Sequence, residues 1–212
     1  MIISKDYIIA HIPKTGGHAL SLMLSKHPKF KFKFDFDFIK NHAIKKKERN
    51  IHKKFSEIYI ENQKLVAVIR RLPSWIMAMQ FHQSVHYKLN YKKRSTKRFR
   101  NRSYSKESQD WSKYNGFLGS ATMTASSTFP DFILKSYLEI PKDKKIHWLR
   151  QEYLAKNISK LLGIKVKSVN KLHGYNYDHN ISKFFFKEEI KRLYNNNPIW
   201  AELEERIYGN LL

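Results

Sequence analysis

The sequence predicts an α/β fold in which helices flank a central, mostly parallel sheet of four or five strands. Short apolar runs at residues 7–12 and 64–70 have the composition of buried strands, and a further strand is expected at residues 145–150. Apolar residues at helical spacing follow each of these runs. Because strands and helices alternate along the chain, parallel strands joined by crossover helices are the expected arrangement.

The first strand, at residues 7–12, leads into a Lys-Thr-Gly-Gly turn at residues 14–17 and then into a helix. Glycines let the backbone turn sharply and bring its N–H groups close to an anion. The first helical turn adds partial positive charge, and Lys14 supplies a mobile ammonium group. This order of elements therefore predicts a turn that binds a phosphate group.

The same alternation continues along the chain. Residues 29–38 alternate phenylalanine with charged residues, which predicts an amphipathic strand with one solvated face. Gly163 is the expected C-cap of a helix at residues 152–162. Further helices are expected at residues 45–62, 74–87 and 130–139, and as two helices separated near residues 195–198 within 182–208.

The length of 212 residues suits a single domain that covers residues 1–212. From Lys88 to about Ser108 the composition changes to Lys, Arg, Ser, Asn and Tyr, and small polar residues continue to residue 128. We therefore expect a basic insertion or lid at about residues 88–128. Two interpretations stay open, a disordered basic loop and an arm that guides an acidic acceptor to the site.

The charge of the chain indicates an anionic partner. Lys and Arg outnumber Asp and Glu by 41 to 18, which gives a net charge of +23. A nucleotide, an acidic polysaccharide, a nucleic acid or an acidic membrane surface would each satisfy this charge. The absence of cysteine excludes disulfides and thiolate metal sites. Since the sequence shows neither a signal peptide nor a long apolar run, we expect a cytoplasmic protein without a transmembrane segment.

Residues 11–17 read His-Ile-Pro-Lys-Thr-Gly-Gly, with the lysine before the glycines. The ordinary nucleotide-triphosphatase loop has the opposite order. The order found here resembles the 5′-phosphosulfate loop of sulfotransferases that use 3′-phosphoadenosine-5′-phosphosulfate (PAPS), especially the carbohydrate-type branch with the heparan sulfate 2-O-sulfotransferases. The resemblance implies a P-loop-like, three-layer fold and a role for Lys14 in holding the transferring sulfuryl group and the bridging oxygen.

The turn departs from the family pattern after its glycines. The family usually continues with Thr-Ser, whereas this chain has His18 and Ala19. Two phosphate-binding hydroxyls are therefore missing, and His18 is a candidate to donate a ring N–H instead. The resemblance then implies that backbone amides hold the 5′-phosphate, and these belong to Thr15, Gly16, Gly17, His18 and Ala19.

The strand at residues 64–70 ends in Val-Ile-Arg, which is similar to the family's Val-Ile-Arg-Asp-Pro. In the family, this arginine and a later serine bind the 3′-phosphate of the cofactor. Arg70 falls on the arginine position, and Ala78, which cannot hydrogen-bond through its side chain, falls on the serine position. A shift of one residue would make Arg71 the binding residue, so we assign Arg70 first and Arg71 second. An arginine suits the role because its guanidinium group forks two N–H groups onto phosphate oxygens.

Residues 38–42 read Phe-Ile-Lys-Asn-His, at the place where the heparan sulfate 2-O-sulfotransferases carry His-Gly-His. His42 matches the second histidine, which is the general base of that branch. A histidine with a pKa near neutrality suits the removal of a proton from an acceptor hydroxyl. Glu or Asp bases, which other members use, remain the alternative.

The resemblance thus predicts transfer of a sulfuryl group from PAPS to a hydroxyl or amine acceptor, with a carbohydrate as the expected acceptor. Adenosine 3′,5′-bisphosphate is then the product, and no metal is required. Two alternatives remain open. A P-loop kinase is disfavoured by the reversed loop, whereas a degenerate sulfotransferase-like fold that binds nucleic acid would use residues 88–108 to follow the phosphates.

Overall fold

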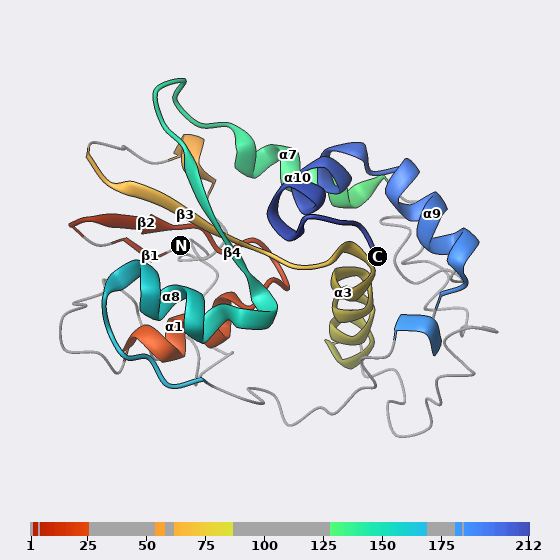
Figure 1. The fold of residues 1–212 in the computed structure, drawn as a ribbon, viewed down its shortest axis with the longest axis horizontal. Coiled ribbons are helices and arrows are strands. Elements are labelled where there is room, and N and C mark those ends of the chain that lie inside the picture. The colour runs from red at the N-terminus through yellow and green to blue at the C-terminus, as the bar shows by residue number, and fades with distance from the viewer. Residues whose placement is uncertain are drawn as a thin grey trace. The chain divides into compact units, whose positions relative to one another are not determined.

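The computed structural model describes residues 2–3, 5–25, 54–57, 62–86, 128–168, 181–183 and 185–212 (Figure 1). Two compact units are formed, the first by residues 1–69 and 136–173 and the second by residues 70–135 and 174–212. Each unit thus combines two segments that lie far apart in the sequence. The expectation of one domain over the whole chain stays a prediction, and residues 88–127 of the expected basic insertion lie outside the described residues.

The first unit contains a four-stranded sheet in the order β1-β2-β3-β4. Its strands are β1 (Ile2–Ile3), β2 (Tyr7–Ile9), β3 (Lys64–Ile69) and β4 (Ile146–Arg150). Strands β2, β3 and β4 are parallel, and β1 pairs antiparallel with β2. A mixed α/β fold with a small parallel sheet is therefore confirmed, while the three-layer arrangement stays a prediction. The strand expected at residues 29–38 lies outside the described residues.

The core of the first unit lies between the sheet and two helices, α1 (Gly17–Ser25) and α8 (Leu154–Leu162). Figure 1 shows these helices side by side against the sheet. Side chains alternate between the faces of a strand, so Val66 and Val68 of β3 point to the same side. They share a buried cluster with Leu24 of α1. Burial of this apolar surface is the main force that holds helices and sheet together.

Helix α8 ends where the sequence predicts, but it begins later than predicted. At its C-cap, Gly163 adopts a left-handed backbone with φ of 62°, which confirms the predicted glycine cap. At its beginning, a 3₁₀ turn (Gln151–Tyr153) precedes the α-helix, so the helix starts at Leu154 rather than at residue 152. The side chain of its N-cap residue, Tyr153, makes no capping hydrogen bond. A tighter first turn is a common way to use backbone groups at such an end.

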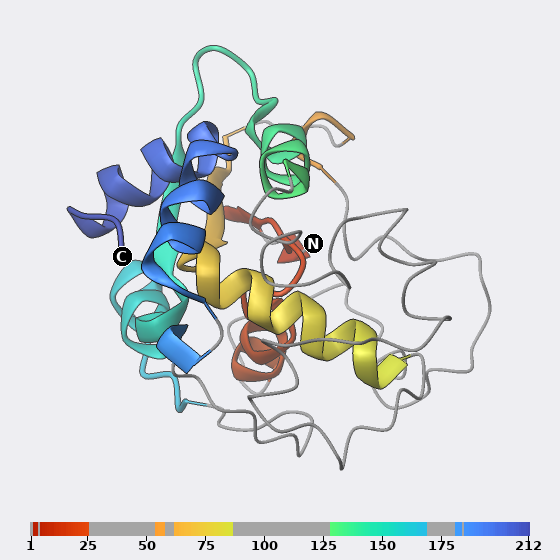
Figure 2. The same ribbon diagram turned by 90° about the vertical axis from the view of Figure 1, so that its right-hand side faces the viewer.

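The second unit contains the helices α3 (Leu72–His86), α9 (Lys187–Asn195) and α10 (Pro198–Tyr208), together with most of α7 (Phe129–Leu138) (Figure 2). A 3₁₀ turn at Ile181–Lys183 precedes α9. The two predicted C-terminal helices are thereby confirmed. Trp75 of α3 and Trp200 of α10 are fully buried, and their ring centroids lie 4.9 Å apart. This aromatic pair joins α3 to α10.

Helices α7 and α10 begin at a shared polar contact. The carboxylate of Asp131 accepts hydrogen bonds from the backbone N–H groups of Ile199 (2.9 Å) and Trp200 (2.8 Å). In return, the side-chain oxygen of Asn197 accepts from the N–H of Asp131 at 3.1 Å. Burial raises the pKa of Asp131 although both backbone bonds act to lower it. Each helix therefore supplies the cap that the other lacks.

We expect Asp131→Ala to lower the free energy of unfolding by about 2 kcal/mol, because it removes two capping bonds at once. Urea denaturation at neutral pH measures the change. Glu202→Ala, which alters an exposed carboxylate on α10, is the matched control and should change stability by less than about 0.5 kcal/mol. An equal effect of the two variants would contradict the capping role of Asp131.

Candidate functional site

The turn between β2 and α1, residues 13–16, is the first candidate site, and we call it the Lys14 turn. Lys14 has a positive φ of 62°, and it is the one non-glycine residue with this conformation in the described part of the chain. A left-handed backbone costs an ordinary residue on the order of 1 kcal/mol. Gly16 follows with φ of 99°. The unfavourable left-handed conformation thus falls on Lys14, the residue that the sequence predicts to bind phosphate.

The side chain of Lys14 is partly buried in the first unit. Desolvation lowers the pKa of its ammonium group from 10.5 to about 8. A bound anion would offset this desolvation, because a negative charge favours the protonated form of a nearby lysine. An anion bound beside Lys14 would therefore raise its pKa again and keep the ammonium group charged.

Backbone amides at the start of α1 lie next to this lysine in the chain. The N–H of Leu20 donates to the carbonyl of Gly16 at 2.9 Å and makes the first hydrogen bond of the helical ladder. The amides of residues 17–19 precede that bond, as the first amides of any α-helix do. The first turn of α1 carries no acidic residue. The helix N-terminus thus offers partial positive charge without an internal anion to neutralise it.

The hydroxyl and the backbone N–H of Thr15, whose amide is one of the predicted phosphate contacts, both have an acceptor inside the turn. Its hydroxyl donates to the carbonyl of Ile12 at 2.9 Å, and its N–H donates to the same carbonyl at 3.4 Å. The residue is buried. In this structure Thr15 therefore closes the turn on itself, and its side chain stabilises the backbone that presents Lys14.

Gly16 of the Lys14 turn and Gly17, the first residue of α1, are both needed for close packing. A Cβ atom at Gly17 would overlap the ring of the buried His11. At Gly16, an added Cβ would lie 3.3 Å from side-chain atoms of Gln151 and Leu154, in addition to the strain of its positive φ. The Lys14 turn is thus packed against its own strand and against the connection from β4 to α8.

The two residues that replace the family's hydroxyl pair lie in the first turn of α1. Ala19 is partly buried and packs against the core cluster between the sheet, α1 and α8. Its methyl group therefore serves packing, and its backbone amide remains the candidate phosphate contact. His18 occupies the preceding helical position, and its side chain lies outside the described part of the structure.

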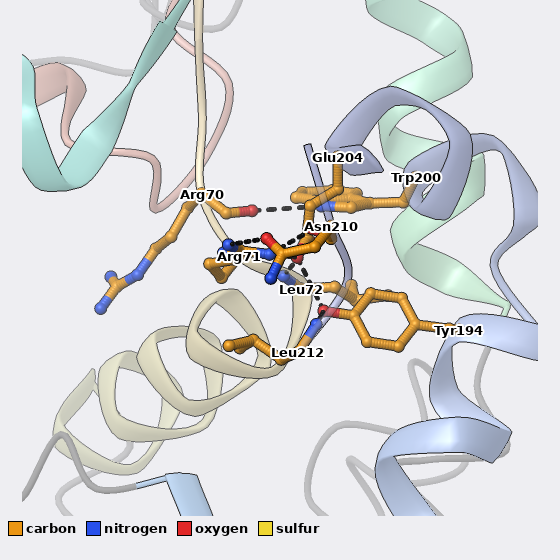
Figure 3. Close-up of polar contacts among 8 residues, drawn as sticks. All are labelled: Arg70, Arg71, Leu72, Tyr194, Trp200, Glu204, Asn210 and Leu212. Atoms are coloured by element: carbon orange, nitrogen blue, oxygen red, sulfur yellow. Dashed lines mark hydrogen bonds and ion pairs between the residues drawn. The ribbon is translucent and has the colours of Figure 1, made fainter. Parts of the chain in front are cut away.

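Arg70 and Arg71 belong to the second unit and differ in their contacts (Figure 3). Arg70 directly follows β3 and is buried, and its carbonyl accepts a hydrogen bond from Trp200 Nε1 at 3.1 Å. Arg71 donates from Nη1 to Glu204 Oε1 at 3.1 Å and from Nη2 to Asn210 Oδ1 at 2.8 Å. The guanidinium of Arg71 is therefore committed to groups of its own unit.

The remaining predicted site residues are placed as follows. Ala78 is buried on α3 in the second unit, and its methyl group has no hydrogen-bonding capacity. His42 lies outside the described residues, so its role as a base stays a prediction. The structure brings Lys14, Thr15 and the two glycines into one turn of the first unit, whereas Arg70 and Ala78 belong to the second.

Sequence reasoning did not identify the buried Glu204. Burial raises the pKa of its carboxyl group, against three hydrogen bonds that lower it. The pKa of Tyr194 is also raised, first by burial and then by the charge of Glu204, so its hydroxyl stays protonated and donates. Glu202 and Glu205 of the same helix are exposed, whereas Glu204 lies one helical turn after the buried Trp200; this helical spacing is the signal in the sequence that could have identified it.

Comparisons with known proteins add no relative: no family model, no curated protein and no solved structure matches the chain. The resemblance to sulfotransferases therefore depends on the residues of the chain themselves. Among the residues that the structure describes, no group of three or more His, Asp or Glu side chains is arranged to hold a metal ion. Within that same part of the chain, no helix is long and apolar enough to cross a membrane.

We expect Gly17→Ala to destabilise the protein by about 2–3 kcal/mol, because the new methyl group overlaps the His11 ring. Thermal or urea denaturation measures the loss. In the double variant His11→Ala/Gly17→Ala the ring is absent, so the cost of the second substitution should fall below about 1 kcal/mol. Additive effects of the two substitutions would show that this contact does not restrict residue 17.

Proposed function

We propose that this chain is a sulfotransferase that moves a sulfuryl group from PAPS to a hydroxyl or amine group, with a carbohydrate as the preferred acceptor. The observation that carries the proposal is Lys14, a partly buried lysine with a left-handed backbone between a parallel strand and a helix N-terminus. A lysine before the glycines, in this structural context, is the arrangement that the family uses for the 5′-phosphosulfate.

The roles of the residues in the reaction follow from their chemistry. The amides at the start of α1 would bind the 5′-phosphate, and Lys14 would neutralise the charge that builds on the bridging oxygen as the sulfur–oxygen bond breaks. Arg70 would bind the 3′-phosphate through paired N–H groups. His42 would take the proton of the acceptor as its oxygen attacks sulfur. Adenosine 3′,5′-bisphosphate leaves with the bridging oxygen.

The contacts of Arg71 count against Arg71 as the phosphate-binding residue. The guanidinium of Arg71 already binds Glu204 and Asn210, and it stacks on Tyr208 with its central carbon 4.1 Å from the ring centroid. Figure 3 shows the side chain of Arg70 pointing away from these groups. Recruitment of Arg71 would require those contacts to break.

The charge of the chain supports an acidic acceptor. A net charge of +23 raises the local concentration of anions and so favours capture of both the tetra-anionic cofactor and an acidic carbohydrate. The basic residues 88–108 are candidates to guide that acceptor. A nucleic acid would be attracted by the same field, so a test of function has to separate selective nucleotide binding from general affinity for phosphate.

We expect the protein to bind adenosine 3′,5′-bisphosphate at least about tenfold more tightly than AMP, because only the bisphosphate carries the 3′-phosphate. Isothermal titration calorimetry at physiological salt measures both dissociation constants. Lys14→Ala should weaken both nucleotides, whereas Arg70→Ala should remove the preference for the bisphosphate. Assays of sulfuryl transfer to acidic oligosaccharides would follow a positive result.

Exposed residues of the same types provide the controls for this titration. Lys156→Ala on α8 and Arg206→Ala on α10 remove one positive charge each and should leave the preference unchanged. Equal, weak binding of the two nucleotides by the wild type would overturn the proposal. Salt-sensitive binding of DNA or RNA in that case would favour the nucleic-acid-binding alternative.

The pKa of Lys14 predicts how binding depends on pH. Because this pKa is about 8 without ligand and a bound phosphate favours the protonated form, binding should take up a proton above pH 8. The dissociation constant of the bisphosphate should therefore rise by up to about tenfold per pH unit from pH 8 upward. Calorimetry in buffers of different ionisation enthalpy measures the uptake. Lys14→Arg, which stays charged, should remove this dependence, and its persistence would exclude Lys14 as the group.

A further inference from the structure

Glu204 lies in the interior of the second unit, and both of its carboxylate oxygens accept hydrogen bonds (Figure 3). Oε1 accepts from the hydroxyl of Tyr194 at 2.7 Å and from Arg71 Nη1 at 3.1 Å. Oε2 accepts from the backbone N–H of Leu72 at 2.8 Å. We call these four residues the Glu204 cluster. Because two of them directly follow Arg70 in the chain, the cluster fixes the backbone on one side of that arginine.

Helix α10 holds the same stretch of backbone at a second point. The indole N–H of Trp200 donates to the carbonyl of Arg70 at 3.1 Å. Trp200 and Glu204 are separated by one helical turn and therefore face the same side of α10. Since one rigid helix binds both the carbonyl of Arg70 and the N–H of Leu72, the intervening backbone has little freedom to rotate.

The two arginines leave this stretch in different directions. Figure 3 shows Arg71 directed into the cluster and toward Asn210, whereas the side chain of Arg70 extends away from both. Arg71 Nη1 also donates to the backbone carbonyl of Asn210 at 2.6 Å, beside the side-chain contact of Nη2. With Arg71 held in this way, and with the carbonyl of Arg70 and the N–H of Leu72 both bound, the side chain of Arg70 leaves this stretch in a different direction (Figure 3).

We propose that Glu204 is a positioning residue for Arg70. By binding Arg71 and the first N–H of α3, it selects which of two adjacent arginines is presented to the 3′-phosphate of the nucleotide. This inference rests on the proposed function. A buried ion pair adds little to stability, because the desolvation of its charges offsets much of their attraction, but it specifies geometry strongly. A carboxylate also accepts from all three donors of the cluster, which the amide of glutamine, with its single acceptor oxygen, cannot reproduce.

The test is the ratio of the dissociation constant for AMP to that for adenosine 3′,5′-bisphosphate, measured on the full chain at neutral pH. Glu204→Gln should lower this ratio by about tenfold and leave the dissociation constant for AMP within about twofold of the wild type. A loss of folded protein alone would weaken both nucleotides equally and leave the ratio unchanged. Glu205→Gln, the same change at an exposed neighbour on α10, should leave the ratio as it is.

Whether the ratio falls or rises in Glu204→Gln shows which of the two arginines binds the 3′-phosphate. If Arg71 were the phosphate-binding residue, removal of the Glu204 charge would release it and the ratio would rise. An unchanged or higher ratio in folded Glu204→Gln, as checked by circular dichroism, therefore overturns the inference. Should that variant not fold, the exposed substitution Asn210→Ala loosens Arg71 and should lower the ratio by about threefold, with no change as the contradicting result.

Failure of the inference and failure of the proposed function give different results. A wild-type protein without preference for the bisphosphate overturns both. A preference that Arg70→Ala removes, but that both Glu204→Gln and Asn210→Ala preserve, overturns only the positioning role of Glu204.

Discussion

The parallel pairing of β3 with β2 on one side and β4 on the other is the constraint on which the Lys14 turn depends. Parallel strands end at the same edge of a sheet, so the segments that follow β2 and β4 come together there. The close approach of Gly16 to the side chains of Gln151 and Leu154 is the direct result. Residues 65–69 of β3 are all buried, so the strand that sets this register is also the most completely covered one. The unusual backbone of Lys14 is thereby supported from outside the turn itself.

In the second unit, two buried carboxylates connect the helices, as strand pairing connects the strands of the first unit. Asp131 of α7 receives the first amides of α10, and Glu204 of α10 receives the first amide of α3. Three helices are thus connected in series through their N-termini, where the orphan N–H groups of a helix need acceptors. Burial raises the pKa of both carboxyl groups, so each link is formed against a desolvation cost. Apolar contacts such as the Trp75–Trp200 pair stabilise the unit, and the hydrogen bonds of Asp131 and Glu204 determine how the helix ends are oriented.

Local patterns in the sequence were sufficient for much of the fold but not for the polar contacts. Three parallel strands, the helix after the glycines and the Gly163 cap follow from apolar periodicity and from the conformational freedom of glycine, which act over a few residues. The start of α3 two residues before its predicted position, by contrast, depends on Glu204, which is 132 residues away. The hydroxyl of Thr15 is a second example. It donates to the carbonyl of Ile12 inside the turn, and the residue type alone does not specify this acceptor. Periodicity identifies faces, whereas the partner of a single buried polar group is set by tertiary packing.

The two alanines at the family's hydroxyl positions share one structural property. Ala19 packs against the core of the first unit and Ala78 is buried in the second, so in both places a methyl group adds apolar contact where the family pattern has a hydrogen-bond donor. In the proposed function, these two positions therefore contribute no hydroxyl, and the roles fall to backbone amides, Lys14 and Arg70. Such a nucleotide site needs its cations held firmly, because no neighbouring hydroxyl compensates for a misplaced guanidinium. In the first unit the backbone of Lys14 is left-handed, and in the second the backbone around Arg70 is hydrogen-bonded on both sides, so each residue is held within its own unit.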